Sequence, residues 1–170
     1  ILDVGTTPSI KSHENIIINK FKWKKNISCL SNQSLNKLKN YHPLISFFKG
    51  DGRKMNFKKN KFDIVFSSAT IEHVGSFNNQ LKFINECFRV SKNLIFITTP
   101  NRNFPIDFHT RLPFIHLFPK KIHRGILKFF GENYLSKESN LNLLTENDLI
   151  SICKINKISN FKIVKIKLFF

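Results

Sequence analysis

The sequence predicts an α/β fold built on an open, mostly parallel sheet, and two patterns lead to it. Short runs that are almost wholly apolar recur along the chain, as is typical of parallel strands buried on both faces. Stretches with apolar residues at helical spacing lie between them, and this β–α alternation is characteristic of parallel sheets. At 170 residues and 41% hydrophobic content, the chain suffices for one domain with a substantial core. We therefore expect a single domain over residues 1–170.

Six segments are expected to be strands. The first five are short and nearly continuous in apolar residues, and the sixth alternates apolar residues with lysines. In chain order they are Ile1–Val4, Ile27–Leu30, Ile45–Phe48, Phe62–Ser67, Leu94–Thr98 and Phe161–Phe170.

Three helices are expected between or after these strands. Ser31–Tyr41 and Asn78–Val90 carry apolar residues on one face at helical spacing. Thr145–Lys154 opens with the letters TEND, which places a hydroxyl at the start and acidic residues in the first turn. Residues 101–142 interrupt the alternation with three prolines and Phe clusters. We expect this segment to be an inserted cap or lid that is helical around Lys120–Phe130.

The composition tells more about the cellular environment of the protein than about its function. Cys29, Cys87 and Cys153 are scattered without CxxC spacing, and the six histidines show no metal-ligand pattern, so we expect a reduced, cytoplasmic protein without a metal. No apolar run reaches the roughly 18 residues that a membrane-spanning helix needs. The chain begins with Ile1 inside a strand-like run, so we expect it to be a fragment.

Charge alone suggests a different kind of partner. The net charge of +17 suits nucleic acid, anionic lipid or an acidic protein. The basic residues are mostly lysines, however, and they are spread from Lys11 to Lys167. This dispersion favours solvated faces over one dedicated nucleic-acid surface.

Three strand ends carry residues suited to a ligand. Asp3–Gly5 closes the first strand, Gly50–Gly52 follows the third, and Phe62–Ser68 leads into Ile71–Gly75 after the fourth. In a doubly wound parallel sheet the carboxyl ends of the strands border one crevice, which is where ligands bind. Glycine at such an end permits a close approach of the backbone to the ligand.

The motifs at these ends resemble those of a known family. ILDVG, GDGRKMNF, KFDIVFSSATIEHVG and ECFRVSKNLIFITTPNR are similar, in this order, to the motifs of class I S-adenosylmethionine-dependent methyltransferases of the type-11-like group. The resemblance covers nearly the whole chain, and the FD-x-V-x-S-x-x-x-EHV block is its most specific part. It implies a Rossmann-like sheet with a helical insertion after the fifth strand, and the family's last, antiparallel strand has no counterpart in the sequence.

The resemblance also implies S-adenosyl-L-methionine as cofactor and a role for matching positions. Asp3, Gly5 and Thr6 are expected beside its methionine half, Asp51 and Gly52 beside adenine, and Ser67 and Ser68 beneath the sulfonium. The sequence departs from the family pattern in two places. The glycine-rich turn is reduced to Gly5 followed by TTP, and Ser31 or Asn32 stands where the family often has the acid that binds ribose.

Candidates on the acceptor side are His73 and His109, because an imidazole has a pKa suited to general base catalysis. Each also has a structural interpretation, His73 as a packed imidazole and His109 as a hydrogen bond within a lid. The fourth strand ends FSSAT and lacks the N-P-P-Y type signature of base methylation, which disfavours a nucleic-acid substrate. We expect a small-molecule, sugar or lipid-linked acceptor, methylated on oxygen or nitrogen.

Two other functions remain open at this point. One is a catalytically inactive Rossmann-like module that contacts nucleic acid or an anionic surface through its lysine excess. The other is a dehydrogenase, which would be expected to carry G-x-G-x-x-G and an acid at the end of the second strand; both are missing.

Overall fold

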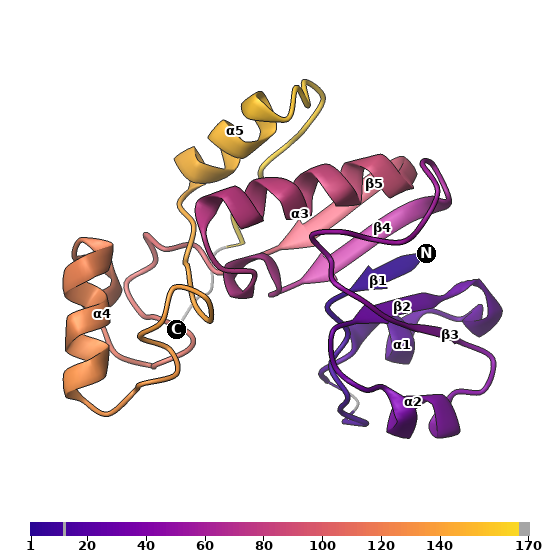
Figure 1. Ribbon diagram of the computed structural model, residues 1–170, viewed down its shortest axis with the longest axis horizontal. Helices are drawn as coiled ribbons and strands as arrows, with labels where there is room; N and C mark the ends of the chain where they lie inside the picture. Colours follow the sequence, from indigo (N-terminus) through magenta and orange to yellow (C-terminus); the bar gives the residue numbers. More distant parts are fainter. Residues whose placement is uncertain (12, 167–170) are drawn as a thin grey trace.

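The centre of the fold is a parallel sheet of five strands within the residues that the computed structural model describes, 1–11 and 13–166 (Figure 1). The order across the sheet is β3-β2-β1-β4-β5, and every neighbouring pair is parallel. The strands are β1 (Leu2–Val4), β2 (Ser28–Ser31), β3 (Ser46–Lys49), β4 (Phe62–Ser68) and β5 (Ser91–Thr98). The predicted open, Rossmann-like sheet is confirmed.

The strand order fixes where a ligand site can form. β1 pairs with β2 on one side, with Leu2 opposite Ser28, and with β4 on the other, with Leu2 opposite Val65. The chain therefore builds outward from β1 in both directions, and the border of β1 and β4 is the switch point of the sheet. Asp3 lies in the middle strand, beside this border.

Two separate apolar cores flank the sheet. Helices α3 (Phe77–Val90) and α5 (Glu146–Ile155) cover one face over β4 and β5, while the short helices α1 (Ile16–Lys20) and α2 (Asn36–Tyr41) lie beside β2 and β3 (Figure 1). The first core joins Leu2 and Val4 of β1 with residues of α3, and the second joins Cys29 of β2 with residues of α1 and α2. Leu30, next to Cys29 in β2, enters the first core, so β2 is covered on both faces. The expectation of strands buried on both faces is wrong for β5, where Leu94 and Phe96 are 52% and 53% exposed.

Helices α3 and α5 each begin at a side-chain cap. Ser76 accepts a hydrogen bond from the Asn79 amide at the start of α3. Thr145 and Asp148 form a complete capping box at the start of α5. Such caps satisfy amide groups that have no partner inside the helix.

Three elements differ from the prediction. The helix expected at Ser31–Tyr41 begins only at Asn36, because Ser31 continues β2 and its carbonyl accepts a hydrogen bond from Gly50. Helix α1 was not predicted, since five residues are too few to show a helical period. The strand expected at Phe161–Phe170 is wrong for residues 161–166, which join no strand, and residues 167–170 lie outside the described part.

Residues 101–142 leave the sheet after β5 and return before α5. They contain the 3₁₀ turn η3 (Ile115–Leu117) and helix α4 (Lys120–Phe129), which lies at the end of the molecule away from α1 and α2 (Figure 1). A β-bridge between Asn101 and Leu144 brings the two ends of the segment together. Two further 3₁₀ turns, η1 (Lys24–Asn26) and η2 (Ile71–His73), precede β2 and follow β4. Among the described residues, no helix is long and apolar enough to cross a membrane.

Candidate functional site

A cavity of about 200 Å³ lies at the switch point of the sheet. Asp3, Gly5 and Thr6 line it from the end of β1, Ser68 lines it from the end of β4, and Asn15 closes it near α1. Four of the positions predicted to surround the cofactor therefore share one cavity. They meet there because the carboxyl ends of adjacent parallel strands lie at the same edge of a sheet.

Asp3 is the charged group of greatest interest in this cavity. Its side chain is buried, and it forms no ion pair with any other residue in 1–11 or 13–166. Burial raises the pKa of the carboxyl to about 6, and a hydrogen bond from Thr6 opposes this only in part. A desolvated carboxylate without a cationic neighbour favours binding of a cation.

The loop after Gly5 is held by a side chain instead of by further glycines. Asn15 donates hydrogen bonds to the carbonyls of Thr7 and Ser9, and its own carbonyl oxygen accepts one from the Thr7 amide. Asn15 is buried, so these bonds fix the path of the loop. This role of Asn15 is not visible in the sequence, because the residues between Thr7 and Asn15 form no motif.

Position 5 requires a glycine because of its backbone conformation and because Thr70 lies very close to it. Its φ of +93° lies in the left-handed region that favours glycine. A Cβ at this position would stand 2.1 Å from the Thr70 hydroxyl oxygen, and this hydroxyl donates to the Ser68 carbonyl at 3.0 Å. The close approach at Gly5 is thus to the protein's own Thr70.

Asp51 follows β3 and is bound by its neighbour Arg53. The guanidinium donates from Nε and Nη2 to the carboxylate, at 2.7 to 3.0 Å, and from Nη1 to the Val74 carbonyl. These hydrogen bonds hold the pKa of Asp51 below its usual range. Next to it, Gly52 packs so closely that a Cβ would stand 2.7 Å from the Phe83 ring. The backbone here is tightly fixed, and the carboxylate is already paired.

The three serines of the predicted site have different environments. Ser68 lines the cavity and shares a hydrogen bond with Thr98. Ser67 points to the other face of β4, where it is fully buried and donates to the Val4 carbonyl at 2.8 Å. Ser31, at the end of β2, is buried and accepts a hydrogen bond from the Gln33 amide. Only Ser68 among them lines the cavity.

A second, more open hollow of about 550 Å³ adjoins the first, and Thr7 and Glu14 line both. Its other walls include Pro8 from the loop after β1 and Asn36 from the start of α2. The two hollows together extend along the ends of β1 and β2.

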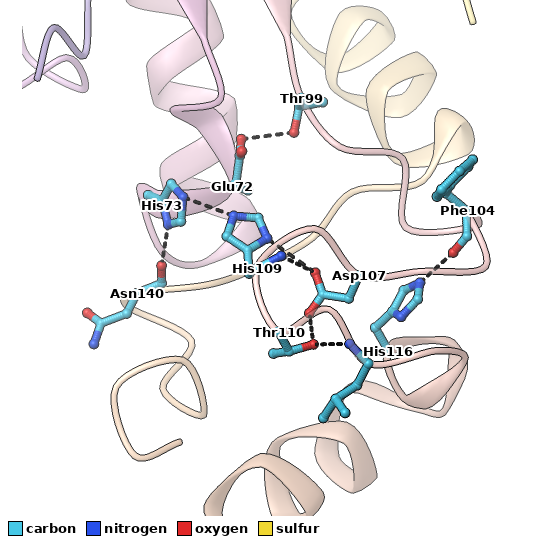
Figure 2. Close-up of polar contacts among 10 residues, drawn as sticks. Glu72, His73, Thr99, Phe104, Asp107, His109, Thr110, His116 and Asn140 are labelled. Atoms are coloured by element: carbon cyan, nitrogen blue, oxygen red, sulfur yellow. Dashed lines mark hydrogen bonds and ion pairs between the residues drawn. The ribbon is translucent and has the colours of Figure 1, made fainter. Parts of the chain in front are cut away.

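The two predicted histidines lie side by side (Figure 2). His73 ends the turn η2, and His109 comes from the segment 101–142; their Nε2 atoms are 3.2 Å apart. Nδ1 of His73 lies 2.6 Å from the carbonyl oxygen of Asn140, and Nδ1 of His109 lies 3.2 Å from a carboxylate oxygen of Asp107. Both rings are therefore oriented by a hydrogen-bond acceptor behind them.

Two buried carboxyl groups accompany these rings. Burial alone would raise the pKa of Asp107, but hydrogen bonds from His109 and Thr110 lower it below its ordinary range. Glu72 is fully buried, and burial raises its pKa. One Glu72 oxygen accepts from Thr99 at 2.9 Å, while Oε1 has no hydrogen-bond partner among the described residues. The sequence motif EH marked Glu72 and His73, whereas nothing linked Asp107 to them.

Comparisons with known proteins agree with this architecture. Residues 24–94 match the model of a family described as a methyltransferase domain. No curated protein matches the chain by sequence.

Solved structures share the fold at low sequence identity, and each of the three matches below covers 91% of this chain. The YcgJ protein of Bacillus subtilis is 12% identical with a TM-score of 0.58, and a SAM-dependent methyltransferase of Methanosarcina mazei is 16% identical with a TM-score of 0.55. A phosphoethanolamine N-methyltransferase of Haemonchus contortus, solved with S-adenosylhomocysteine, is 17% identical with a TM-score of 0.58.

The shared part is 59% of the Bacillus chain, 77% of the Methanosarcina chain and 32% of the Haemonchus chain, so this chain spans about three fifths of the first. The segment matched by the family model includes β2, β3, β4 and α3. The chain therefore contains a segment that matches the methyltransferase-domain model, within a fold that it shares with these solved structures.

Proposed function

We propose that the protein is a S-adenosylmethionine-dependent methyltransferase that acts on an oxygen or nitrogen of a small-molecule, sugar or lipid-linked acceptor. The observation that carries this proposal is the buried Asp3 carboxylate in the wall of the cavity at the switch point. The cofactor carries an ammonium and a sulfonium, and binding of a cation relieves the cost of burying an unpaired carboxylate.

The residues of the cavity fit the methionine half of the cofactor. Asp3 accepts the ammonium, Gly5 and Thr6 form the floor, and Ser68 supplies a polar wall without positive charge. The adenosine half extends toward the ends of β2 and β3, where Ser31 faces the ribose and Asp51 with Gly52 faces adenine. Ser67, which is turned into the sheet, supports this edge through its bond to Val4.

The bound cofactor supplies an activated methyl group. The chain's own part is to position the acceptor, exclude water and accept the acceptor's proton. We propose that His73 or His109 accepts this proton. Hydrogen bonds to Asn140 and Asp107 orient the two rings, which stand at the carboxyl edge of the sheet. Segment 101–142 supplies His109 and is proposed to enclose the acceptor. A cytoplasmic location, expected from the unpaired cysteines, belongs to the same proposal.

The binding step is tested by calorimetry with S-adenosylhomocysteine. We expect the intact protein to bind it and Asp3→Ala to weaken binding at least tenfold, since the ammonium then loses its carboxylate. Asp63→Ala is the matched control, because Asp63 is an exposed acid of β4. Failure of the folded protein to bind, or equal losses in both variants, would contradict the proposal and leave the lysine-rich binding module as the better explanation.

A further inference from the structure

We infer that Glu72, His73 and His109 form a binding site for a divalent transition-metal ion of the zinc class. One ligand atom from each of these residues lies within 4.8 Å of the other two; Glu72 and His73 are neighbours in the sequence, and His109 comes from the segment 101–142 (Figure 2). No metal-ligand spacing is visible in the sequence, because the fold alone brings His109 to the EH motif.

The hydrogen bonds of the two rings determine which nitrogen of each ring carries a proton. The Asn140 carbonyl and the Asp107 carboxylate accept hydrogen bonds only, so Nδ1–H of each neighbouring ring must be the donor. A neutral imidazole that carries its proton on Nδ1 has a lone pair on Nε2. The two Nε2 lone pairs of His73 and His109 therefore face each other, and such an arrangement needs a cation between them.

The separation of the nitrogens suits two ligands of one metal ion. Bonds of about 2.0–2.1 Å at a tetrahedral angle place two nitrogen ligands roughly 3.3 Å apart. The Nε2 atoms of His73 and His109 are 3.2 Å apart, and their rings are inclined at 76° to each other. The imidazoles thus already stand at the spacing of coordinated rings.

Glu72 supplies the third ligand. Its side chain is completely buried, and Oε1 has no hydrogen-bond partner among the described residues. A buried carboxylate oxygen without a partner costs free energy, and a metal ion relieves this cost. Because metal–oxygen bonds are about 2.0–2.2 Å long, Glu72 moves toward the rings when the ion binds.

The groups behind the ligands are those that metal sites use. A coordinating histidine almost always donates its other N–H to a carboxylate or a backbone carbonyl, which fixes the ring and raises its basicity. Asp107 does this for His109 and the Asn140 carbonyl does it for His73. Asp107 is itself held by a hydrogen bond from Thr110 at 2.7 Å. Both rings are therefore held in place before the ion arrives.

Two imidazoles and one carboxylate favour zinc and neighbouring first-row ions over magnesium or calcium, which prefer oxygen ligands. Three protein ligands leave at least one coordination position for water or another small oxygen ligand. The inference does not depend on methyl transfer, so the metal site and the cofactor site can be tested and can fail separately. Metal binding and proton acceptance are alternative roles for the two rings, because an Nε2 atom that binds an ion has no lone pair left for a proton.

The experiment is titration of the metal-free protein with Co²⁺ alone, followed by visible absorption, and with Zn²⁺ alone by calorimetry. We expect one ion per chain, visible d–d bands of the bound Co²⁺ and displacement of Co²⁺ by Zn²⁺. His73→Gln, His109→Gln and Glu72→Gln should each weaken binding at least tenfold, and Asp107→Asn should weaken it by a smaller factor. His13→Gln, which alters an exposed histidine, is the matched control.

Thermal unfolding separates loss of the site from loss of the fold. His73 is exposed, so His73→Gln should unfold like the unaltered protein without metal, yet lack the upward shift that Zn²⁺ gives the unaltered protein. Absence of Co²⁺ bands in the unaltered protein would overturn the inference. Equal losses in His73→Gln and His13→Gln would do so as well, and would indicate that the two imidazoles share a proton.

Discussion

Gln80 of α3 and Asn142, at the end of the segment 101–142, form a reciprocal pair of buried hydrogen bonds. Gln80 Nε2 donates to the Asn142 carbonyl at 2.7 Å, and Asn142 Nδ2 donates to Gln80 Oε1 at 3.3 Å. Asn142 Nδ2 also donates to the Gly75 carbonyl, and Asn142 Oδ1 accepts a hydrogen bond from Lys120 at the start of α4. The backbone amide of Asn142 donates to the Glu72 carbonyl. One side chain thus connects the segment to the helix that covers the sheet.

Asn142→Ala should therefore destabilise the fold more than an ordinary surface substitution. It leaves the carbonyls of Gly75 and of the Gln80 side chain without a donor, and each unsatisfied buried group costs about 1–3 kcal/mol. We expect the free energy of unfolding, measured with urea, to fall by roughly 2–4 kcal/mol. Asn133→Ala, at an exposed position of the same segment, should change it by less than about 0.5 kcal/mol; similar losses in both variants would show that Asn142 has no special role.

Gly5→Ala should be destabilising for two reasons that can be separated. The new Cβ meets Thr70, and φ is positive at Gly5. Thr70→Gly removes the contact but also the Thr70 hydrogen bond, so it serves as the reference. When Gly5→Ala is added to Thr70→Gly, only the backbone strain is new, and the substitution should cost less than it does in the original protein. Gly125→Ala is the control: this glycine lies within α4 with no atom near its absent Cβ, and alanine there should stabilise by about 0.5–1 kcal/mol. A Gly5→Ala protein as stable as the original would refute the close contact.

Asp3 should give the ligand-free protein a measurable pH dependence. Its pKa is raised by burial from 3.8 in the unfolded chain to about 6, so the folded state binds more protons between these values. This group therefore lowers stability as the pH rises from 4 to 6, and the full loss remains above pH 6. A pKa difference of about two units changes the free energy of unfolding by at most roughly 3 kcal/mol.

The substitution Asp3→Asn removes the contribution of this carboxyl group to the pH dependence of stability. We expect the variant to equal the original protein near pH 4 and to exceed it by about 2–3 kcal/mol at pH 7, measured by urea unfolding at a series of pH values. The difference between the two proteins is the quantity to follow, since other carboxyl groups titrate in both. A difference that does not change with pH would mean that Asp3 has an ordinary pKa in the folded state.

Arg53→Gln should affect ligand affinity more than stability. The Asp51–Arg53 ion pair is partly exposed, so its loss costs less than about 1 kcal/mol. Because the guanidinium occupies both Asp51 oxygens, its removal frees the carboxylate, and affinity for S-adenosylhomocysteine should rise several-fold by calorimetry. Asp51→Ala should lower the affinity. Changes in the same direction would argue against a contact between Asp51 and adenine.

The sequence predicts the sheet well because its signal is local. Each of the five strands that form contains a short apolar run, and α3 and α5 begin at side-chain caps. Residues 161–166 show why such signals are insufficient alone. Alternation in FKIVKI assigns faces to a strand, but a strand also needs a partner, and in the described part this segment pairs with none.

The candidate site is only partly readable for a related reason. The sequence places Asp3, Ser68 and the EH motif at strand ends, and their meeting at one edge follows from the parallel order. It does not reveal which face a side chain enters, so Ser67 and Ser68 look equivalent although only Ser68 lines the cavity. The support from Asn15, Thr70 and Asp107 depends on loops whose paths no periodicity encodes.

The bridge between Asn101 and Leu144 has a consequence for variation of this fold. Since the polypeptide departs and re-enters at neighbouring points, residues between them can be gained or lost while β5 and α5 keep their positions. The entropy of closing such a loop grows only slowly with its length. Related chains can therefore exchange this stretch as a cassette and so change what faces the carboxyl edge, while the sheet stays constant.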